Sequence, residues 1–338
     1  MALSRQKENM EALIMTKKPR LKKPYLIVAW PGMGEVAFKA AEYLIQELKC
    51  QEFARIMPEE FFYQTGSVIS AGILEVPLLP QGKFYYWKNP LTKGVISGKN
   101  DLVIFLSNAQ PDLSKADSYA KIIINLALDL GVESIVSFAS MPQATDHTQD
   151  SKVWFAATDQ KTKESLKKYN FATLVDGQIS GMNGLFLGIA KKAKLKGFCL
   201  LGEIPLYTIQ IENPKASASV LEALGKILNI VINVAPLKEQ ALLMENEINK
   251  LLEYLKLGSA GVSAPIGQEE VELIKKTLSQ LTHLPVSIKE KIEKLFAESR
   301  LDITKATELK AQLDKWNVYK EYEDKFLDLF RKNTDKGN

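Results

Sequence analysis

The stretch Gly177–Pro205, GQISGMNGLFLGIAKKAKLKGFCLLGEIP, joins a glycine-rich turn, an apolar helix and a long apolar strand. Gly181, Gly184 and Gly188 stand beside or inside the predicted helix, where a glycine costs about 1 kcal/mol relative to alanine. Gly184 and Gly188 are four residues apart, so they share one helix face. We expect this face to lie close against the sheet or a neighbouring subunit. The N–H groups around 180–183 would also form a helix start that favours anions.

The same alternation of apolar strand and amphipathic helix extends through residues 24–257. Predicted strands cover Tyr25–Trp30, Asp101–Ser107, Ser134–Ser140, Val153–Thr158 and Gly197–Glu203, and predicted helices cover about 35–49, 115–130 and 215–228. A β-rich insertion occupies Glu52–Trp87. Continuous apolar strands between amphipathic helices are typical of a mainly parallel sheet that helices cover on both faces. The pattern therefore predicts an α/β domain.

The character of the chain changes after Pro236. A heptad seam begins there with Leu237, Ala241, Met244, Ile248, Leu251 and Leu255. Residues 258–267 are rich in small residues and predict a linker. Residues 268–332 predict a helical appendage, and 333–338 a tail. In the appendage, apolar residues recur at helical spacing: Val271, Ile274, Leu278, Leu281, Ile288, Ile292, Leu295, Ile303, Ala306, Leu309, Leu313, Trp316, Tyr319, Tyr322, Phe326 and Leu329.

Composition places the chain among ordinary globular proteins. Of its 338 residues 46% are hydrophobic and 25% are charged. A chain of this size buries enough surface to fold without disulfides. Its two cysteines, Cys50 and Cys199, fit a reducing compartment, and we expect the protein to be cytoplasmic. No apolar run approaches the ~20 residues that span a bilayer, so we expect no membrane partner.

The net charge of +4 is concentrated at the beginning of the chain. Residues 1–24 hold seven lysines and arginines against two glutamates, so the remainder is close to neutral. This distribution gives no long basic stripe for a nucleic-acid face, and we expect no nucleic-acid partner. We interpret residues 1–23 as a flexible basic leader that is solvated. The alternative is a tail that touches an acidic partner.

The segment PGMGEVA at Pro31–Ala37 fits the G-x-G-x-x-A spacing of a dinucleotide-binding turn. The acidic residue that should follow about twenty residues later is not at the end of a second strand, because Glu59 and Glu60 come late. We favour a tight strand-to-helix turn over a cofactor site. Residues 94–100, GVISGKN, lack the spacing of a phosphate loop. We therefore expect no cofactor and no turnover of NAD or ATP.

No set of catalytic residues emerges from the sequence. His147 lies in the polar loop TDHTQD, which we interpret as a surface loop, and Cys199 lies in an apolar run. We predict no catalytic residue and no metal site. A ligand site, if the chain binds a small molecule, belongs where the carboxyl ends of the strands meet glycine-rich turns. The candidate positions are Gly32, Gly34, Asn108, Gln110, Ser180, Asn183 and Glu203.

Several segments in a fixed order resemble the proteasome assembly chaperone family of archaea, bacteria and eukaryotes. They are PGMGEVAFKAAEYL (31–44), FYYWKN (84–89), LSNAQPD (106–112), ISGMNGLFLGIAK (179–191), GFCLLGEIPLY (197–207) and NPKASASVLEALGKILNI (213–230). The resemblance covers about residues 24–256. It leaves the appendage outside.

This resemblance implies an αβα sandwich like that of nucleoside phosphorylases and assembly into homo-oligomers. Eukaryotic members escort proteasome α subunits, and some archaeal members bind the proteasome through a C-terminal hydrophobic-Tyr-X tail. This sequence ends Lys336-Gly337-Asn338 and lacks that signal. The family supplies no catalytic residues.

Two classes of function follow. The first is a non-catalytic assembly chaperone or scaffold that acts through protein–protein contacts, with proteasome-like subunits as possible partners. The second is a binding protein or enzyme of the phosphorylase-like fold for a nucleoside- or phosphate-like ligand.

Overall fold

Four parallel strands form the centre of the main sheet. They are β7 (Leu102–Ser107), β2 (Tyr25–Ala29), β8 (Ser134–Gln143) and β11 (Gly197–Pro205), in that spatial order. The computed structural model describes residues 12–64, 66–90, 100–259, 286–315 and 319–331. Every residue of β11 is buried, and β11 pairs with β8 over its whole length. The apolar end of the stretch 177–205 is therefore a central strand.

The flanks of the sheet are mostly antiparallel. On one side β6 (Gly82–Trp87), β3 (Gln51–Ile56) and β1 (Leu13–Met15) follow β7, and on the other β9 (Val153–Ala157) and β10 (Ala172–Thr173) follow β11. The full order within the described residues is β1-β3-β6-β7-β2-β8-β11-β9-β10. The predicted fold class, an α/β sandwich around a mixed sheet with a parallel centre, is confirmed.

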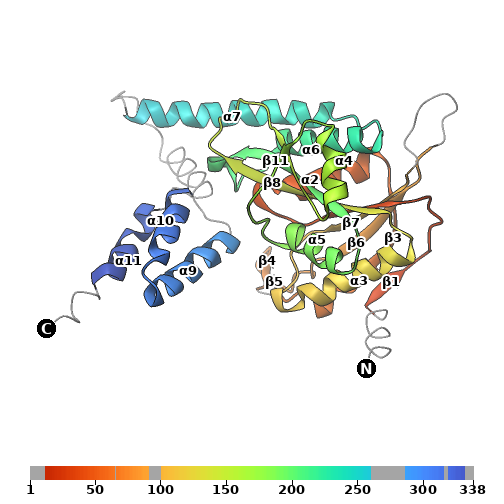
Figure 1. Cartoon of the computed structure of the whole chain (residues 1–338), viewed down its shortest axis with the longest axis horizontal. Coiled ribbons are helices and arrows are strands. Elements are labelled where there is room, and N and C mark those ends of the chain that lie inside the picture. Colours follow the sequence, from red (N-terminus) through yellow and green to blue (C-terminus); the bar gives the residue numbers. More distant parts are fainter. Residues whose placement is uncertain (1–11, 65, 91–99, 260–285, 316–318, 332–338) are drawn as a thin grey trace. The chain divides into compact units, whose positions relative to one another are not determined.

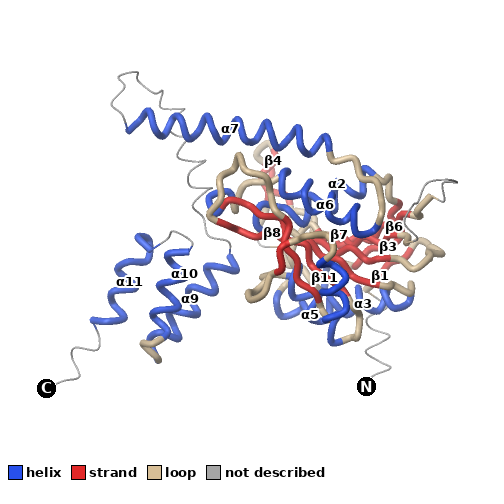
Figure 2. Tube along the Cα trace, turned by 45° about the horizontal axis from the view of Figure 1, so that its top comes forward, coloured by secondary structure: helices blue, strands red, loops and turns tan. Residues whose placement is uncertain are grey.

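Helices cover both faces of this sheet (Figures 1 and 2). On one face α2 (Val36–Glu47) contacts α6 (Pro214–Leu228), and on the other α3 (Ala116–Asp129) contacts α5 (Met182–Lys192). α4 (Gln160–Lys167) lies against β9, and α7 (Ala235–Ser259) lies along α6.

An aromatic cluster fills the core between the sheet and the α3–α5 layer. The Trp30 ring lies 5.4 Å from that of Phe105 and 5.6 Å from that of Phe186. All three side chains are fully buried. The strands β2 and β7 and the helix α5 thus meet through their largest apolar side chains, and this fixes where α5 begins relative to the sheet.

The N-terminal segment corrects one prediction. Residues 12–23 are not a flexible leader, because Leu13–Met15 form the edge strand β1 and pair antiparallel with Ala54–Ile56. Ala12 is 2% exposed and belongs to the core. Backbone pairing with β3 and the buried Ala12 attach this segment, although Ile14 and Met15 are exposed. Residues 1–11 lie outside the described part of the chain.

The glycines of α5 also differ from expectation. A side chain at Gly184 would meet the backbone oxygen of Ile179 in the preceding loop at 2.2 Å, so this glycine permits a close turn rather than contact with the sheet. Gly188 is exposed, and a side chain there would meet nothing within 4 Å. The prediction that both glycines share a packed face is therefore wrong for Gly188. The two glycines lie on the same face of α5, but the preceding loop covers this face only at Gly184, in the first turn.

A small hairpin stands apart from the main sheet. Its strands are β4 (Val68–Ser70) and β5 (Ile73–Glu75), which pair only with each other among the described residues. Ala71 and Gly72 at the turn both have positive φ, of 49° and 83°. This is the two-residue turn whose twist suits a hairpin. Four of its apolar side chains are exposed, Val68, Ile69, Ile73 and Leu74, and so are Val76 and Leu78 in the segment that follows.

The chain divides into two compact units at residues 265 and 266. The second unit contains α9 (Val286–Leu301), α10 (Lys305–Lys315) and α11 (Tyr319–Arg331). Its own core consists of Ile292, Leu295, Phe296, Ala306, Leu309, Leu313, Phe326 and Leu329. The division falls inside the predicted linker. The predicted positions Val271, Ile274, Leu278, Leu281 and Trp316 and the tail lie outside the described residues.

Candidate functional site

Two amide side chains join the end of β2 to the start of α5. Asn183, which is 4% exposed, accepts a hydrogen bond from Trp30 N through Oδ1 (3.0 Å) and donates one from Nδ2 to Trp30 O (2.9 Å). Gln110 donates from Nε2 to Pro31 O (2.7 Å), and its Oε1 accepts from Met182 N (2.8 Å). The carboxyl ends of β2 and β7 are thus tied to the first turn of α5 through main-chain atoms.

Gly181 makes room for the Gln110 amide, whereas the space beside Asn183 would also accommodate a side chain at Gly32. Gly181 has a φ of 72°, and a side chain there would lie 2.9 Å from Gln110 Nε2. A side chain at Gly32 would lie 3.5 Å from Asn183 Nδ2. The left-handed conformation at Gly181 is accessible to glycine at little cost. The structure therefore brings together the predicted positions Gly32, Gln110 and Asn183, with Ser180 next to Gly181.

The turn after β2 is bonded to the loop between β11 and α6. Gly34, with a φ of 62°, donates its N–H to Ile209 O (2.7 Å), and its C=O accepts from Asn213 N (2.8 Å). The N–H that a dinucleotide site would direct toward a pyrophosphate is used inside the protein. This geometry supports the interpretation of PGMGEVA as a tight strand-to-helix turn.

The two remaining candidates lie elsewhere. Asn108 accepts from Gln81 N through Oδ1 (2.7 Å) and holds the segment before β6. Glu203, near the end of β11, is 8% exposed and accepts from Trp154 Nε1 (2.9 Å). It lines a different pocket from the Asn183 cluster. The seven positions do not form one site in the described structure, and their ligand-binding role stays a prediction.

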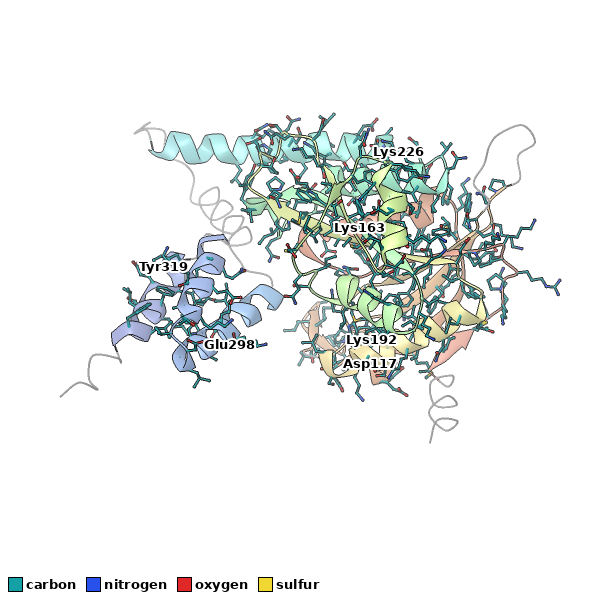
Figure 3. All side chains as sticks on the ribbon, in the orientation of Figure 1. Asp117, Lys163, Lys192, Lys226, Glu298 and Tyr319 are labelled. Atoms are coloured by element: carbon teal, nitrogen blue, oxygen red, sulfur yellow. The ribbon has the colours of Figure 1, made fainter. Side chains whose placement is uncertain are left out.

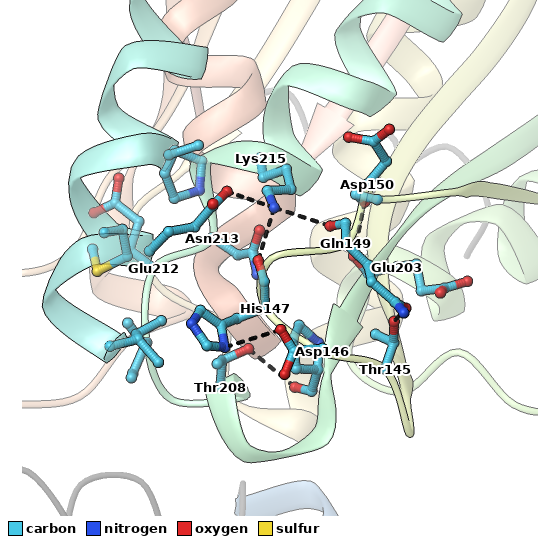
Figure 4. A pocket seen from close by; sticks show the side chains of 18 residues that line it. Thr145, Asp146, His147, Gln149, Asp150, Glu203, Thr208, Glu212, Asn213 and Lys215 are labelled. Carbon is cyan, nitrogen blue, oxygen red and sulfur yellow. Dashed lines mark hydrogen bonds and ion pairs between the residues drawn. The ribbon is translucent and has the colours of Figure 1, made fainter. Parts of the chain in front are cut away.

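The pocket beside Glu203 is built around His147 (Figure 4). The loop lies at the surface as predicted, because its residues 146 and 148–150 are exposed, but His147 itself is 7% exposed and therefore buried. Nδ1 lies 2.8 Å from Tyr207 Oη, and Nε2 lies 2.9 Å from Asn249 Oδ1 on α7. Tyr207 Oη also accepts from His147 N (2.9 Å), and partial burial raises the pKa of this phenol. His147 thus connects its loop to the turn after β11 and to α7.

Lys215 completes this connection. Its Nζ donates to His147 O (2.7 Å) and Gln149 O (2.9 Å) and forms an ion pair with Glu245 of α7 (2.5 Å). The cavity has a volume of about 30 Å³, room for roughly two waters. The polar groups that line it are therefore mostly engaged with one another, and the arrangement holds the loop, α6 and α7 together.

Sequence reasoning missed this network because its members are far apart in the chain. Tyr207 is 60 residues from His147 and Asn249 is 102 residues away. Tyr207 is the last residue of the segment GFCLLGEIPLY. An aromatic hydroxyl just after a strand was the one sequence feature that indicated a polar contact at this place.

The described residues contain no group of three or more His, Cys, Asp or Glu side chains placed to hold a metal ion. Burial raises the pKa of both cysteine thiols to about 12. Neither thiol is therefore activated as a nucleophile. None of the helices in the described ranges is both long and apolar enough to cross a bilayer.

Comparison with known proteins assigns the fold to a family. The chain belongs to the PAC2 family, whose match covers residues 26–252. These residues include the whole parallel centre of the sheet, the Asn183 cluster and the His147 network. The helices α9 to α11 lie beyond the match.

Individual relatives agree with this assignment. The uncharacterized protein MJ1210 of Methanocaldococcus jannaschii is 28% identical over 269 residues, which cover 77% of this chain and 97% of that protein. The crystal structure of Pyrococcus furiosus PbaB, an archaeal proteasome activator, is 27% identical with a TM-score of 0.59 and covers 71% of this chain and 97% of its own. PbaA of the same organism, an archaeal homolog of proteasome-assembly chaperone, is 26% identical with a TM-score of 0.53, covering 73% and 98%.

Proposed function

We propose that this protein is a non-catalytic assembly factor that acts through protein–protein contacts as a homo-oligomer. The observation that carries the proposal is the exposed β4–β5 hairpin. Ile69 and Leu74 are opposite each other across the two strands and are 71% and 70% exposed. A two-stranded hairpin is at best marginally stable alone in water, so this one gains most from being covered. Large exposed apolar patches mark interaction sites.

The composition of the hairpin favours a second copy of the chain as its occupant. Glu75 is the single charged residue between positions 61 and 82. Homo-oligomer interfaces are more apolar than those of partners that also exist apart, which carry more polar and charged groups. Each strand also has one unpaired outer edge among the described residues, to which an identical hairpin can add around a two-fold axis.

Light scattering on the full chain tests this assembly. The unaltered protein should have a mass that is a multiple of 37.8 kDa, and the double variant Ile69→Lys/Leu74→Lys should be monomeric. The matched control is Leu242→Lys/Leu243→Lys on α7, where the side chains are 60% and 68% exposed. The proposal is refuted if the unaltered protein is a monomer at every concentration. It is also refuted if the Ile69→Lys/Leu74→Lys variant keeps the mass of the unaltered oligomer.

For the heterologous partner we propose proteasome-like subunits, on the basis of the family and of the names of PbaB and PbaA. The test is co-sedimentation with purified proteasome particles of the source organism, in the presence and absence of the hairpin substitutions. Failure to co-sediment would remove the proteasome as partner and leave the homo-oligomer to be judged by its mass.

The second class, a small-molecule binder of the phosphorylase-like fold, is less well supported. The His147 pocket offers the chemistry, with a histidine, Lys215 and Glu203. Its volume of about 30 Å³ is far below the roughly 300–1,000 Å³ of ligand pockets.

A further inference from the structure

The basic segment that precedes β2 lies along one edge of the sheet. β3, β7, β2, β8 and β11 all run in the same direction, so their first residues share an edge, here called the amino edge. Lys17 donates to the first residue of β3 (3.0 Å), and Lys18 forms an ion pair with Asp129 at the end of α3 (2.6 Å). Lys22 donates its N–H to Asp101 just before β7 (2.6 Å). The charges of residues 17–23 are thus spread along the amino edge.

Lysines at the ends of helices extend the same edge. Helices that return between parallel strands end where the next strand begins. Lys192 ends α5 and Lys194 follows it, Lys49 follows α2, and Lys226 lies in the last turn of α6. Figure 3 labels Lys192 and Lys226. Lys196 also lies at this edge. Its C=O accepts a hydrogen bond from N of Ile135 (3.0 Å), which is the second residue of β8.

Lys18 is paired with Asp129, but the carboxylates at this edge leave several of its lysines without an ion pair. Asp101 is 6% exposed, and its two oxygens accept from the backbone N–H groups of Lys22 and Asn89. Glu133 accepts from the Asn100 side chain (3.0 Å). Within the part of the chain that the structure describes, Lys23, Lys49, Lys192, Lys194 and Lys226 have no carboxylate within 4.0 Å, and all five are exposed. Elsewhere, pairs such as Lys121–Asp117 and Lys238–Glu222 are common.

Three of these lysines occupy unfavourable backbone conformations. Lys23, Lys49 and Lys194 have φ values of 42°, 52° and 63°. Lys49 and Lys194 follow the ends of helices, where glycine is the usual residue because it adopts the left-handed region at lower energy. Placing lysine there concentrates charge at the amino edge at the expense of backbone energy. Such departures from local preference are typical of functional surfaces.

We propose that the amino edge is a docking surface for an acidic segment of a partner protein, an inference that rests on the proposed role in protein assembly. The helix ends at this edge present carbonyl groups and the negative end of the helix dipole, whereas phosphates bind at helix amino ends. Lysine side chains carry the charge outward from these carbonyls. These lysine side chains can reach carboxylates on the side chains of a partner protein. A phosphate backbone would have to come close to the helix carbonyl groups, which repel it.

Binding of fluorescent poly-L-glutamate to the full chain at low salt tests the proposal. The variant Lys23→Gly/Lys49→Gly/Lys194→Gly should raise Kd by about tenfold, since several exposed charge pairs are lost. Its melting temperature should stay equal or rise, because glycine fits the left-handed conformation. The control Lys121→Gln/Lys238→Gln/Lys250→Gln removes the same charge from α3 and α7 and should leave Kd within about twofold.

The remaining outcomes are decided by parallel measurements. An amino-edge variant that binds poly-L-glutamate like the unaltered chain overturns the proposal. Tighter binding of poly-U RNA, or of phosphatidylserine vesicles, lost in the same variant, overturns the choice of a protein partner. The amino-edge variant should keep the mass of the unaltered oligomer. If it both dissociates and stops binding poly-L-glutamate, the lysines act through assembly and the proposal is overturned. The hairpin variant Ile69→Lys/Leu74→Lys should still bind poly-L-glutamate, so failure of the homo-oligomer is distinguishable from failure of this inference.

Discussion

Gly184 and Gly188 show how one helix face can contain two unrelated environments. At Gly184 the loop residue Ile179 comes within 2.2 Å of where a side chain would begin, whereas Gly188 faces open space. The spacing of four residues identified the shared face but not how far along α5 the loop extends. Sequence periodicity reports direction around a helix axis, while the covering segment is set by the turn at 177–181.

The substitutions Gly184→Ala and Gly188→Ala should therefore have opposite effects. Gly184→Ala should lower the free energy of unfolding by about 1–3 kcal/mol, because the loop backbone must move. Gly188→Ala should raise it by up to about 1 kcal/mol, because alanine is the better helix former. Urea denaturation followed by circular dichroism measures both. If the two variants shift stability in the same direction, the local account of α5 fails.

The half-buried thiol of Cys50 and the buried thiol of Cys199 predict a dependence on alkaline pH. Burial raises the pKa of Cys50 and of Cys199 from about 9 to about 12. A thiol with a higher pKa in the folded state contributes stability that is complete below about pH 9 and is lost as the pH rises toward about 12. Both should resist iodoacetamide at about pH 8 in the native protein and react in urea. Mass spectrometry measures the modification, and rapid native labelling of Cys199 would contradict its burial.

At the scale of elements, α7 is held to the domain by two different means. Leu237 and Ala241 begin the predicted heptad seam and are buried. Met244 and Ile248 continue the seam at the His147 pocket, where Asn249 and Glu245 add polar contacts. The side chain of Leu255 falls outside the described ones. The seam was predictable from spacing, whereas the polar contacts depend on a loop one hundred residues earlier.

Removing the Asn249 amide should loosen this attachment. Asn249→Ala leaves Nε2 of the buried His147 without its partner, and the expected loss of stability is about 1 kcal/mol. Amide hydrogen exchange should accelerate in residues 145–151 and along α7. Asn246→Ala, at an exposed position of the same helix, is the control and should change neither. Unchanged exchange in both variants would show that the apolar seam alone holds α7.

The parallel strands were predictable because each is a continuous apolar run, such as Leu26–Ala29 or Phe198–Leu201. A strand buried on both faces needs no polar alternation, so composition identifies it. The edge strand β1 has three residues and one neighbour, which gives almost no signal. Asn183 was identified as a candidate from its place in a glycine-rich turn. Its hydrogen bonds to Trp30, 153 residues away, could not be predicted, because they depend on the order of the strands in the sheet.

For the molecule as a whole, each unit has a core made from its own residues. We predict that a chain ending at residue 259 keeps the fold of the α/β unit, because the core of this unit is built from its own residues. Its urea midpoint should match the first transition of the full chain, and light scattering should give the same subunit number. An insoluble or unfolded product would show that the helical unit is required for folding.

The position of β11 has a consequence for synthesis. This strand is the last of the sheet in sequence, yet it lies between β8 and β9. Among the described residues, β9 and β10 pair with each other and are joined to the rest of the sheet through β11, so until β11 is made they have no place in the main sheet. Contacts between segments far apart in sequence form slowly, and exposed strands meanwhile favour aggregation. In a nascent chain the pair β9–β10 therefore stays apart from the main sheet until Pro205 has emerged, and only then can the sheet close around its last strand.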